Sequence, residues 1–241
     1  MIEQKLIVGR YLELVTGQPV LLGAPANGFQ EVTRVVLHIE ESESVGAPVT
    51  PYNPVGNPSL KMRATVRAAQ AREFVTGQFN RQRVSGTGTG AVTKTHRNFV
   101  WLEWLGGLVS EVQPNGVDVL TGPMSGCWIT SYLKNGVRYV GHVGTVMAAA
   151  DPLSVAARTA WNNFAHGLQM GAMSGFNPFN DWNGGFPVAQ PGDGAMKTFA
   201  LVTAANTFHT VVTFSQANKP TRIRIAGVQQ IQPTLPNNGQ I

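Results

Sequence analysis

The stretch Met124–His142, which reads MSGCWITSYLKNGVRYVGH, is the most informative part of the sequence. At its centre, Asn135-Gly136 lies between two runs rich in β-branched and aromatic residues. An Asn-Gly pair in this setting predicts a type I′ turn, because both residues tolerate the positive φ that this turn needs. A two-residue turn pairs Ile129 with His142. Because side chains alternate along a strand, Cys127 and His142 are then expected on the same face of the sheet.

Cys127 is the only cysteine in the chain. A thiol ionises only slightly at neutral pH, but a neighbouring imidazolium lowers its pKa and creates a nucleophile. A thiolate attacks acyl carbons, and an imidazole protonates the departing amine or ammonia and then activates water. The alternative is a buried cysteine that serves as a small apolar residue and a histidine that only shares its sheet face. The residues alone favour neither interpretation.

The element Ser125-Gly126-Cys127, with His142 fifteen positions after the cysteine, resembles the catalytic element of the cytotoxic necrotizing factor deamidases. The preceding segments Trp101–Gly107 and Gln113–Gly116 resemble the same region of Burkholderia lethal factor, a single-domain relative. The resemblance covers residues 99–146. It implies a mixed β-sandwich wrapped by helices, and an enzyme that hydrolyses one glutamine side chain of a host protein to glutamate.

Carried over to this sequence, the resemblance implies that Cys127 is the nucleophile and His142 is the base. In the lethal factor a threonine six residues before the cysteine orients the histidine, and the matching position is Thr121. The necrotizing factors use a backbone carbonyl for that purpose. The small pair Ser125-Gly126 would let the substrate approach the main chain, where N–H groups can bind an oxyanion. Pro123-Met124 departs from the lethal factor, and this affects the expected shape of the substrate groove.

Composition favours one β-rich domain over residues 1–241. Hydrophobic residues make up 43% of the sequence and charged residues 13%, and the 27 glycines and 15 prolines indicate many turns. The single cysteine excludes an internal disulfide, and no Cys/His cluster has metal-ligand spacing, so no cofactor is expected. There is no apolar run long enough to span a membrane, and the first ten residues do not resemble a secretory signal. With the resemblance, this predicts a bacterial effector without a cleaved signal, acting in the cytosol of a target cell.

The rest of the chain predicts an α+β fold, mainly an antiparallel β-sandwich flanked by helices. Asp151-Pro152 opens the clearest helix, whose apolar residues recur every three or four positions to about Gly167. Strands are predicted at 31–39, 99–105, 117–120 and, as an antiparallel meander, at 198–203, 207–214 and 221–228. Residues 174–194 form either a lid or a loop packed by its own aromatic side chains. The Gln/Pro/Asn-rich tail from Gln229 is expected to be frayed.

The chain has a formal net charge of +5, and its positive charge is concentrated in residues 61–97. This segment contains eight Lys and Arg residues and only one acidic residue. Nucleic-acid binding is a weaker interpretation than a solvated face or a surface that steers an acidic protein partner, because no nucleic-acid motif is present. The partner implied by the resemblance is a host protein: one relative modifies a Rho-type GTPase and another a translation initiation helicase. A non-catalytic interaction domain, a cysteine peptidase and a transglutaminase remain alternatives to the deamidase.

Overall fold

The hairpin at Asn135-Gly136 forms in the computed structural model with the register that the sequence predicts. Strand β9 (Trp128–Lys134) pairs antiparallel with β10 (Val137–Val143), and His142 lies opposite Ile129. The φ angles of 53° at Asn135 and 76° at Gly136 are those of a type I′ turn. The side-chain faces of both strands are therefore set by this local turn.

The structure describes residues 6–14, 21–32, 36–44, 83–86, 90–93, 98–168 and 172–241. Two compact units are present: residues 1–43 together with 98–241, and residues 44–97. In the second unit, β4 (Arg83–Gly86) and β5 (Gly90–Thr93) pair antiparallel. The strand at 60–66 and the helix at 68–75 that the sequence also favours lie outside the described residues. A single domain over residues 1–241 stays a prediction.

In the first unit, seven strands form a closed barrel in the order β1-β14-β13-β12-β8-β6-β3. Their bounds are β1 Arg10–Leu14, β3 Val36–Ser44, β6 Asn98–Leu102, β8 Asp118–Met124, β12 Asp193–Val202, β13 Phe208–Gln216 and β14 Lys219–Ile231. The predicted C-terminal meander is confirmed as β12, β13 and β14, which pair antiparallel in sequence order. One neighbouring pair, β6 with β8, is parallel.

A second sheet of five strands has the order β11-β9-β10-β7-β2. Besides the hairpin it contains β2 (Phe29–Glu31), β7 (Val109–Val112) and β11 (Met173–Phe176). Strands β2 and β7 are parallel, and the other neighbours are antiparallel. Strands β7 and β11, of four residues each, were not predicted from the sequence.

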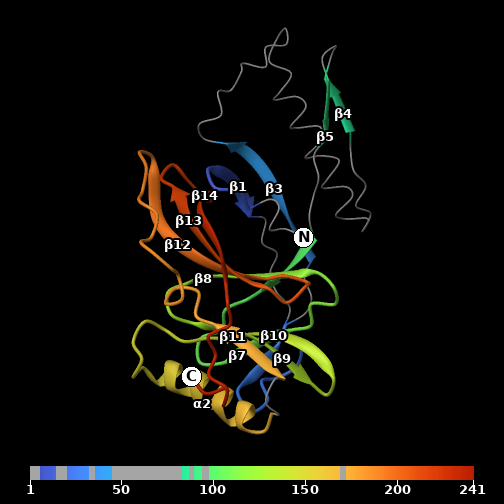
Figure 1. Ribbon diagram of the computed structural model, residues 1–241, viewed down its shortest axis with the longest axis vertical. Helices are drawn as coiled ribbons and strands as arrows, with labels where there is room; N and C mark the ends of the chain where they lie inside the picture. Colours follow the sequence, from blue (N-terminus) through green and yellow to red (C-terminus); the bar gives the residue numbers. More distant parts are fainter. Residues whose placement is uncertain are drawn as a thin grey trace. The chain divides into compact units, whose positions relative to one another are not determined.

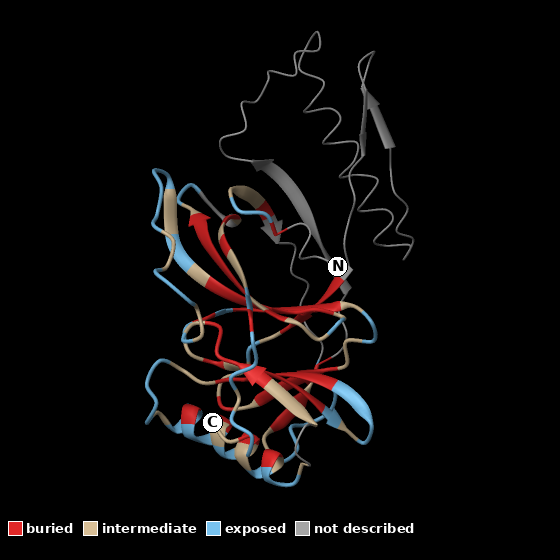
Figure 2. Cartoon of the chain, viewed as in Figure 1, coloured by how far each residue is buried: buried red, intermediate tan, exposed pale blue. Residues whose placement is uncertain are grey.

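Helix α2 (Pro152–His166) covers one face of this five-stranded sheet (Figure 1). As predicted, Asp151 caps its N-terminus: the Asp151 Oδ1 accepts a hydrogen bond from the Leu153 N–H at 2.9 Å. Trp161 is fully buried against Tyr132 of the sheet. The opposite side of α2 is exposed to solvent (Figure 2). Within the described part of the chain, no helix has the length and hydropathy needed to cross a membrane.

The C-terminal tail is ordered against α2, so the expectation of a frayed tail from Gln229 is wrong. The Trp161 Nε1 donates a hydrogen bond to the Gly239 carbonyl at 2.8 Å. The Asn162 side chain accepts a hydrogen bond from the Ile241 N–H and donates one to the Ile241 carbonyl. The Gln/Pro/Asn composition is polar, but its main-chain groups satisfy polar atoms of the helix.

The two sheets pack face to face and create a buried layer between them. The Ile129 and Val140 side chains enter this layer from the five-stranded sheet, and those of Val100 and Val119 enter it from the barrel strands. A second core, with Phe99 at its centre, fills the other face of the barrel strands. The prediction of a mainly β, α+β fold is confirmed, with two differences: the larger sheet closes into a barrel, and each sheet contains one parallel pair.

Candidate functional site

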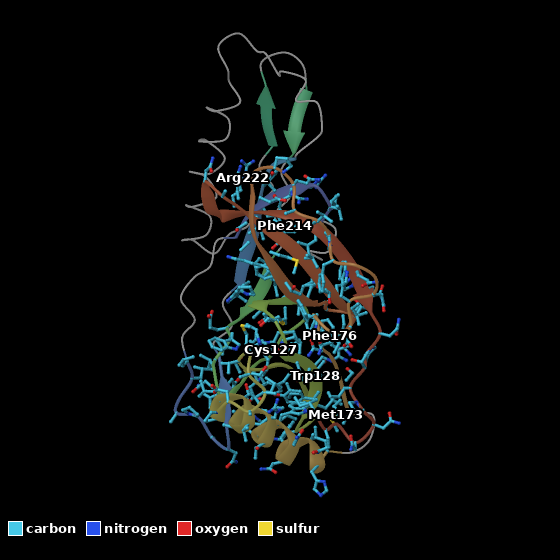
Figure 3. All side chains as sticks on the ribbon, turned by 90° about the vertical axis from the view of Figure 1, so that its left-hand side faces the viewer. Cys127, Trp128, Met173, Phe176, Phe214 and Arg222 are labelled. Atoms are coloured by element: carbon cyan, nitrogen blue, oxygen red, sulfur yellow. The ribbon has the colours of Figure 1, made fainter. Side chains whose placement is uncertain are left out.

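Cys127 lies in the buried layer between the two sheets, directly before β9. Its side chain is 4% exposed and packs in the same apolar cluster as Ile129 and Phe176. Figure 3 shows Cys127 between the barrel strands and helix α2. The β9–β10 register puts His142 opposite Ile129, on the same face of the sheet. The prediction that Cys127 and His142 share a face is confirmed.

The His142 ring is held by Thr121, which reaches it from the barrel. The Thr121 Oγ1 lies 2.7 Å from the His142 Nδ1, and both side chains are fully buried. This contact joins β8 of one sheet to β10 of the other, because Thr121 faces the shared layer as Val119 does. The structure thus brings together the threonine and the histidine that the resemblance implies.

The Nε2 atom of His142 is buried and has no hydrogen-bond partner among the described residues. Buried polar atoms without partners are rare and often lie at functional sites. With the ring proton on Nδ1, Thr121 accepts it and Nε2 carries the free lone pair. In this tautomer the unpaired Nε2 atom of His142 is a proton acceptor.

The Cys127 thiol is hydrogen-bonded to Thr145 and not to His142. The thiol donates to the Thr145 carbonyl at 3.4 Å, and the Thr145 hydroxyl donates to the Cys127 Sγ at 3.5 Å. Trp104 donates its Nε1 hydrogen to the same carbonyl at 3.2 Å. Among the described residues, no hydrogen bond joins the thiol to the imidazole, although a formed dyad would have one.

Burial keeps both groups of the expected dyad neutral. It raises the pKa of the Cys127 thiol, and hydrogen bonds from Thr145 and Trp104 offset this only in part. Burial also lowers the pKa of His142 from 6.5 to about 3. The expected thiolate–imidazolium pair is thus not the state that the structure favours. A neutral imidazole remains able to take the thiol proton when a substrate binds.

The turn before Cys127 is the exposed side of the site. Ser125 is exposed and Gly126 is half-buried. A Cβ atom placed on Gly126 would meet nothing within 4 Å, so there is open space beside this peptide. At Gly144, by contrast, a Cβ atom would lie 1.9 Å from the Leu105 carbonyl oxygen. The main chain at Gly126 is therefore accessible, as the small Ser-Gly pair predicts.

Three residues near the thiol were not identified from the sequence as part of the site: Trp104, Thr145 and Asn177. The Asn177 Nδ2 donates a hydrogen bond to the Gly126 carbonyl at 3.1 Å, across 51 residues of sequence. Thr145 could have been found, because it follows the end of β10 next to the start of β9. No local pattern indicates Asn177, which lies in the loop predicted at 174–194. That loop packs on its own aromatic side chains, since Phe186 stacks on both Phe179 and Trp182.

No group of three or more His, Cys, Asp or Glu side chains in the described residues is arranged to hold a metal ion. His209 lies in β13, where its Nε2 is 3.1 Å from the Thr207 hydroxyl. No protein-family model matches the sequence, and a search of curated proteins finds no match either.

Proposed function

We propose that the protein hydrolyses the side-chain carboxamide of a glutamine in another protein and converts it to glutamate. The observation that carries this proposal is the arrangement of His142: Thr121 holds its Nδ1, its Nε2 is unpaired, and the only thiol of the chain enters the same layer. Such an arrangement serves a nucleophile–base pair whose base is oriented by a third group. The resemblance of the Ser125-Gly126-Cys127 element selects glutamine as the substrate side chain.

In the proposed reaction the thiol of Cys127 first turns from the Thr145 carbonyl to His142 Nε2. Nε2 takes the thiol proton as the sulfur attacks the carboxamide carbon and the carbonyl oxygen becomes an oxyanion. The intermediate collapses to a thioester, and ammonia leaves with the proton from Nε2. Nε2 then takes a proton from water, the hydroxide attacks the thioester, and glutamate is released as the proton returns to sulfur.

Thr121 has a separate role in this scheme. Its hydrogen bond to Nδ1 fixes the orientation of the ring, and when the hydroxyl accepts the Nδ1 proton, Nε2 is the basic atom. The neutral state of His142 suits a base, because an imidazolium cannot accept the thiol proton. The peptide of Gly126, open on one side, is the part of the main chain that a carboxamide can approach.

The host substrate and the cell in which the protein acts are part of the same proposal. The resemblance is to toxins that enter other cells, so we propose an effector acting on a cytosolic protein of a target cell. Free glutamine and short peptides should be poor substrates, because binding energy away from the carboxamide is needed to position it in a buried site.

A second candidate is a non-catalytic interaction domain, and the burial of Cys127 favours it. A thiol that is 4% exposed, with a raised pKa and two hydrogen bonds to Thr145, also fits a structural cysteine. The test is ammonia release from host-cell proteins treated with wild-type, Cys127→Ser and His142→Ala protein. Release by the wild type alone supports attack of the thiol on a carboxamide, a step that a transglutaminase shares. Cleaved fragments would identify a peptidase, and no change would favour the interaction domain.

A further inference from the structure

We propose that Asn177 is a positioning residue that aims the backbone N–H of Cys127 at the oxyanion of the reaction. This inference rests on the proposed deamidase function and adds a residue to it. Asn177 follows β11 directly, and β11 pairs with β9 through Phe176 and Ile129. The pairing places Asn177 beside the turn that precedes the nucleophile.

The hydrogen bonds of Asn177 fix which of its side-chain atoms faces Gly126. The Asn177 Oδ1 accepts hydrogen bonds from the Phe179 N–H at 3.2 Å and the Asn180 N–H at 3.0 Å. Because two donors face Oδ1, the other end of the amide must be the NH₂ group. That group donates to the Gly126 carbonyl at 3.1 Å. Asparagine fits this position, since aspartate would turn an oxygen toward a carbonyl oxygen.

Asn177 is itself rigidly held. Its side chain is 2% exposed, and its backbone N–H donates to the Asp181 Oδ2 at 2.6 Å. The same carboxylate oxygen accepts a hydrogen bond from the Thr234 hydroxyl at 2.5 Å, which ties the loop to the C-terminal segment. Thr210 of β13 also donates to the Pro178 carbonyl. The loop that carries the side-chain amide of Asn177 is therefore held in place.

The direction of one peptide follows from this contact. The Gly126–Cys127 bond is trans, and in a trans peptide the C=O and the following N–H point in opposite directions. Because Asn177 holds the Gly126 carbonyl, it sets the direction of the Cys127 N–H. The N–H of the nucleophile is a common oxyanion donor, and such donors act through preorganised geometry. The open space beside Gly126 gives the carboxamide access to this peptide.

The test compares two substitutions that keep the cap of the loop but lose the donor. Asn177→Asp retains an oxygen for the two N–H groups, and Asn177→Ser retains a hydroxyl that is too short to reach Gly126. Asn180→Asp is the matched control, because Asn180 is exposed and the charge change is the same. We expect kcat to fall about 10- to 100-fold in both Asn177 variants. KM should stay within about two-fold, and the control should be unchanged. Folded Asn177 variants with wild-type kcat would overturn the proposal.

A second measurement separates this inference from the proposed function. In the wild-type protein the side-chain NH₂ of Asn177 should exchange slowly with solvent by NMR, and in Asn177→Ser the amide signal of Cys127 should shift. Fast exchange of the NH₂ group, or an unmoved Cys127 signal, would refute the positioning role whether or not the protein deamidates. If the wild type releases no ammonia while both NMR results hold, the deamidase proposal fails and the control of the peptide by Asn177 stands.

Discussion

Replacing His142 by glutamine should change how the stability of the protein depends on pH. The imidazole is fully buried, and burial lowers its pKa from 6.5 to about 3. In the unfolded chain the same group titrates near its ordinary value. Between these two pKa values the unfolded chain binds a proton that the folded protein does not bind. Acid therefore stabilises the unfolded state, and the free energy of unfolding falls as the pH drops below 6.5.

The magnitude follows from the two pKa values. At pH 8 the imidazole is neutral in both states, so His142 contributes nothing to the pH dependence. At pH 5 the folded imidazole is still neutral, while the unfolded one is mostly protonated. The resulting loss, RT ln(1 + 10^(6.5 − 5)), is about 2 kcal/mol. The loss grows down to about pH 3 and then stops, because the folded imidazole also takes up a proton.

The assay is urea denaturation of wild-type and His142→Gln protein at pH 8, 7, 6 and 5. Glutamine does not titrate, and the other histidines are present in both proteins, so their contributions cancel in the difference. We expect the stability of the wild type relative to the variant to fall by about 2 kcal/mol from pH 8 to pH 5. Parallel pH profiles would show that the ring is accessible to protons, and would refute a buried neutral base.

Three further predictions concern the site and the tail. Thr121→Val keeps the shape of the side chain but removes the partner of His142 Nδ1. The free energy of unfolding should therefore fall by about 1–3 kcal/mol in urea denaturation, and kcat should also fall. Wild-type values for both would mean that Thr121 does not orient the ring. Gly126→Ala should change the free energy of unfolding by no more than about 0.5 kcal/mol, because the new Cβ meets nothing within 4 Å. Its kcat/KM should drop, because the methyl group blocks the substrate. An unchanged kcat/KM would place the substrate elsewhere. Trp161→Phe loses the hydrogen bond to the Gly239 carbonyl, so the free energy of unfolding should fall by about 1–3 kcal/mol. The C-terminal tail should then become accessible to limited proteolysis. A tail that stays resistant to protease would contradict its packing against α2.

The parts of the fold that the sequence predicted well are those set by neighbours in the chain. The Asn135-Gly136 turn determines the register of β9 and β10, and with it the shared face of Cys127 and His142. The Asp151 cap likewise marks the start of α2. These features need only the local backbone preferences of a few residues, so the pattern of residues was sufficient to predict them.

The parts that the sequence did not predict depend on contacts between distant segments. Asn177 meets Gly126 across 51 residues, and the tail meets Trp161 across 78. Neither contact leaves a periodic pattern. The predicted direction of the thiol pKa shift was wrong for the same reason. A lowered thiol pKa was expected from the pairing of Cys127 and His142, but burial between two sheets raises the thiol pKa and lowers that of His142. Only the resemblance pointed to Thr121, whose contact with His142 spans 21 residues.

The central claim is that Cys127 converts a glutamine of a host protein to glutamate, with water as the second substrate. The most direct measurement treats host-cell lysate with wild-type or Cys127→Ser protein in heavy-oxygen water and maps modified glutamines by peptide mass spectrometry. We predict one glutamine that becomes a glutamate carrying one heavy oxygen atom, with the wild type only. An amine adduct at that glutamine would mean transglutamination. Identical peptide maps for the two proteins would contradict the claim.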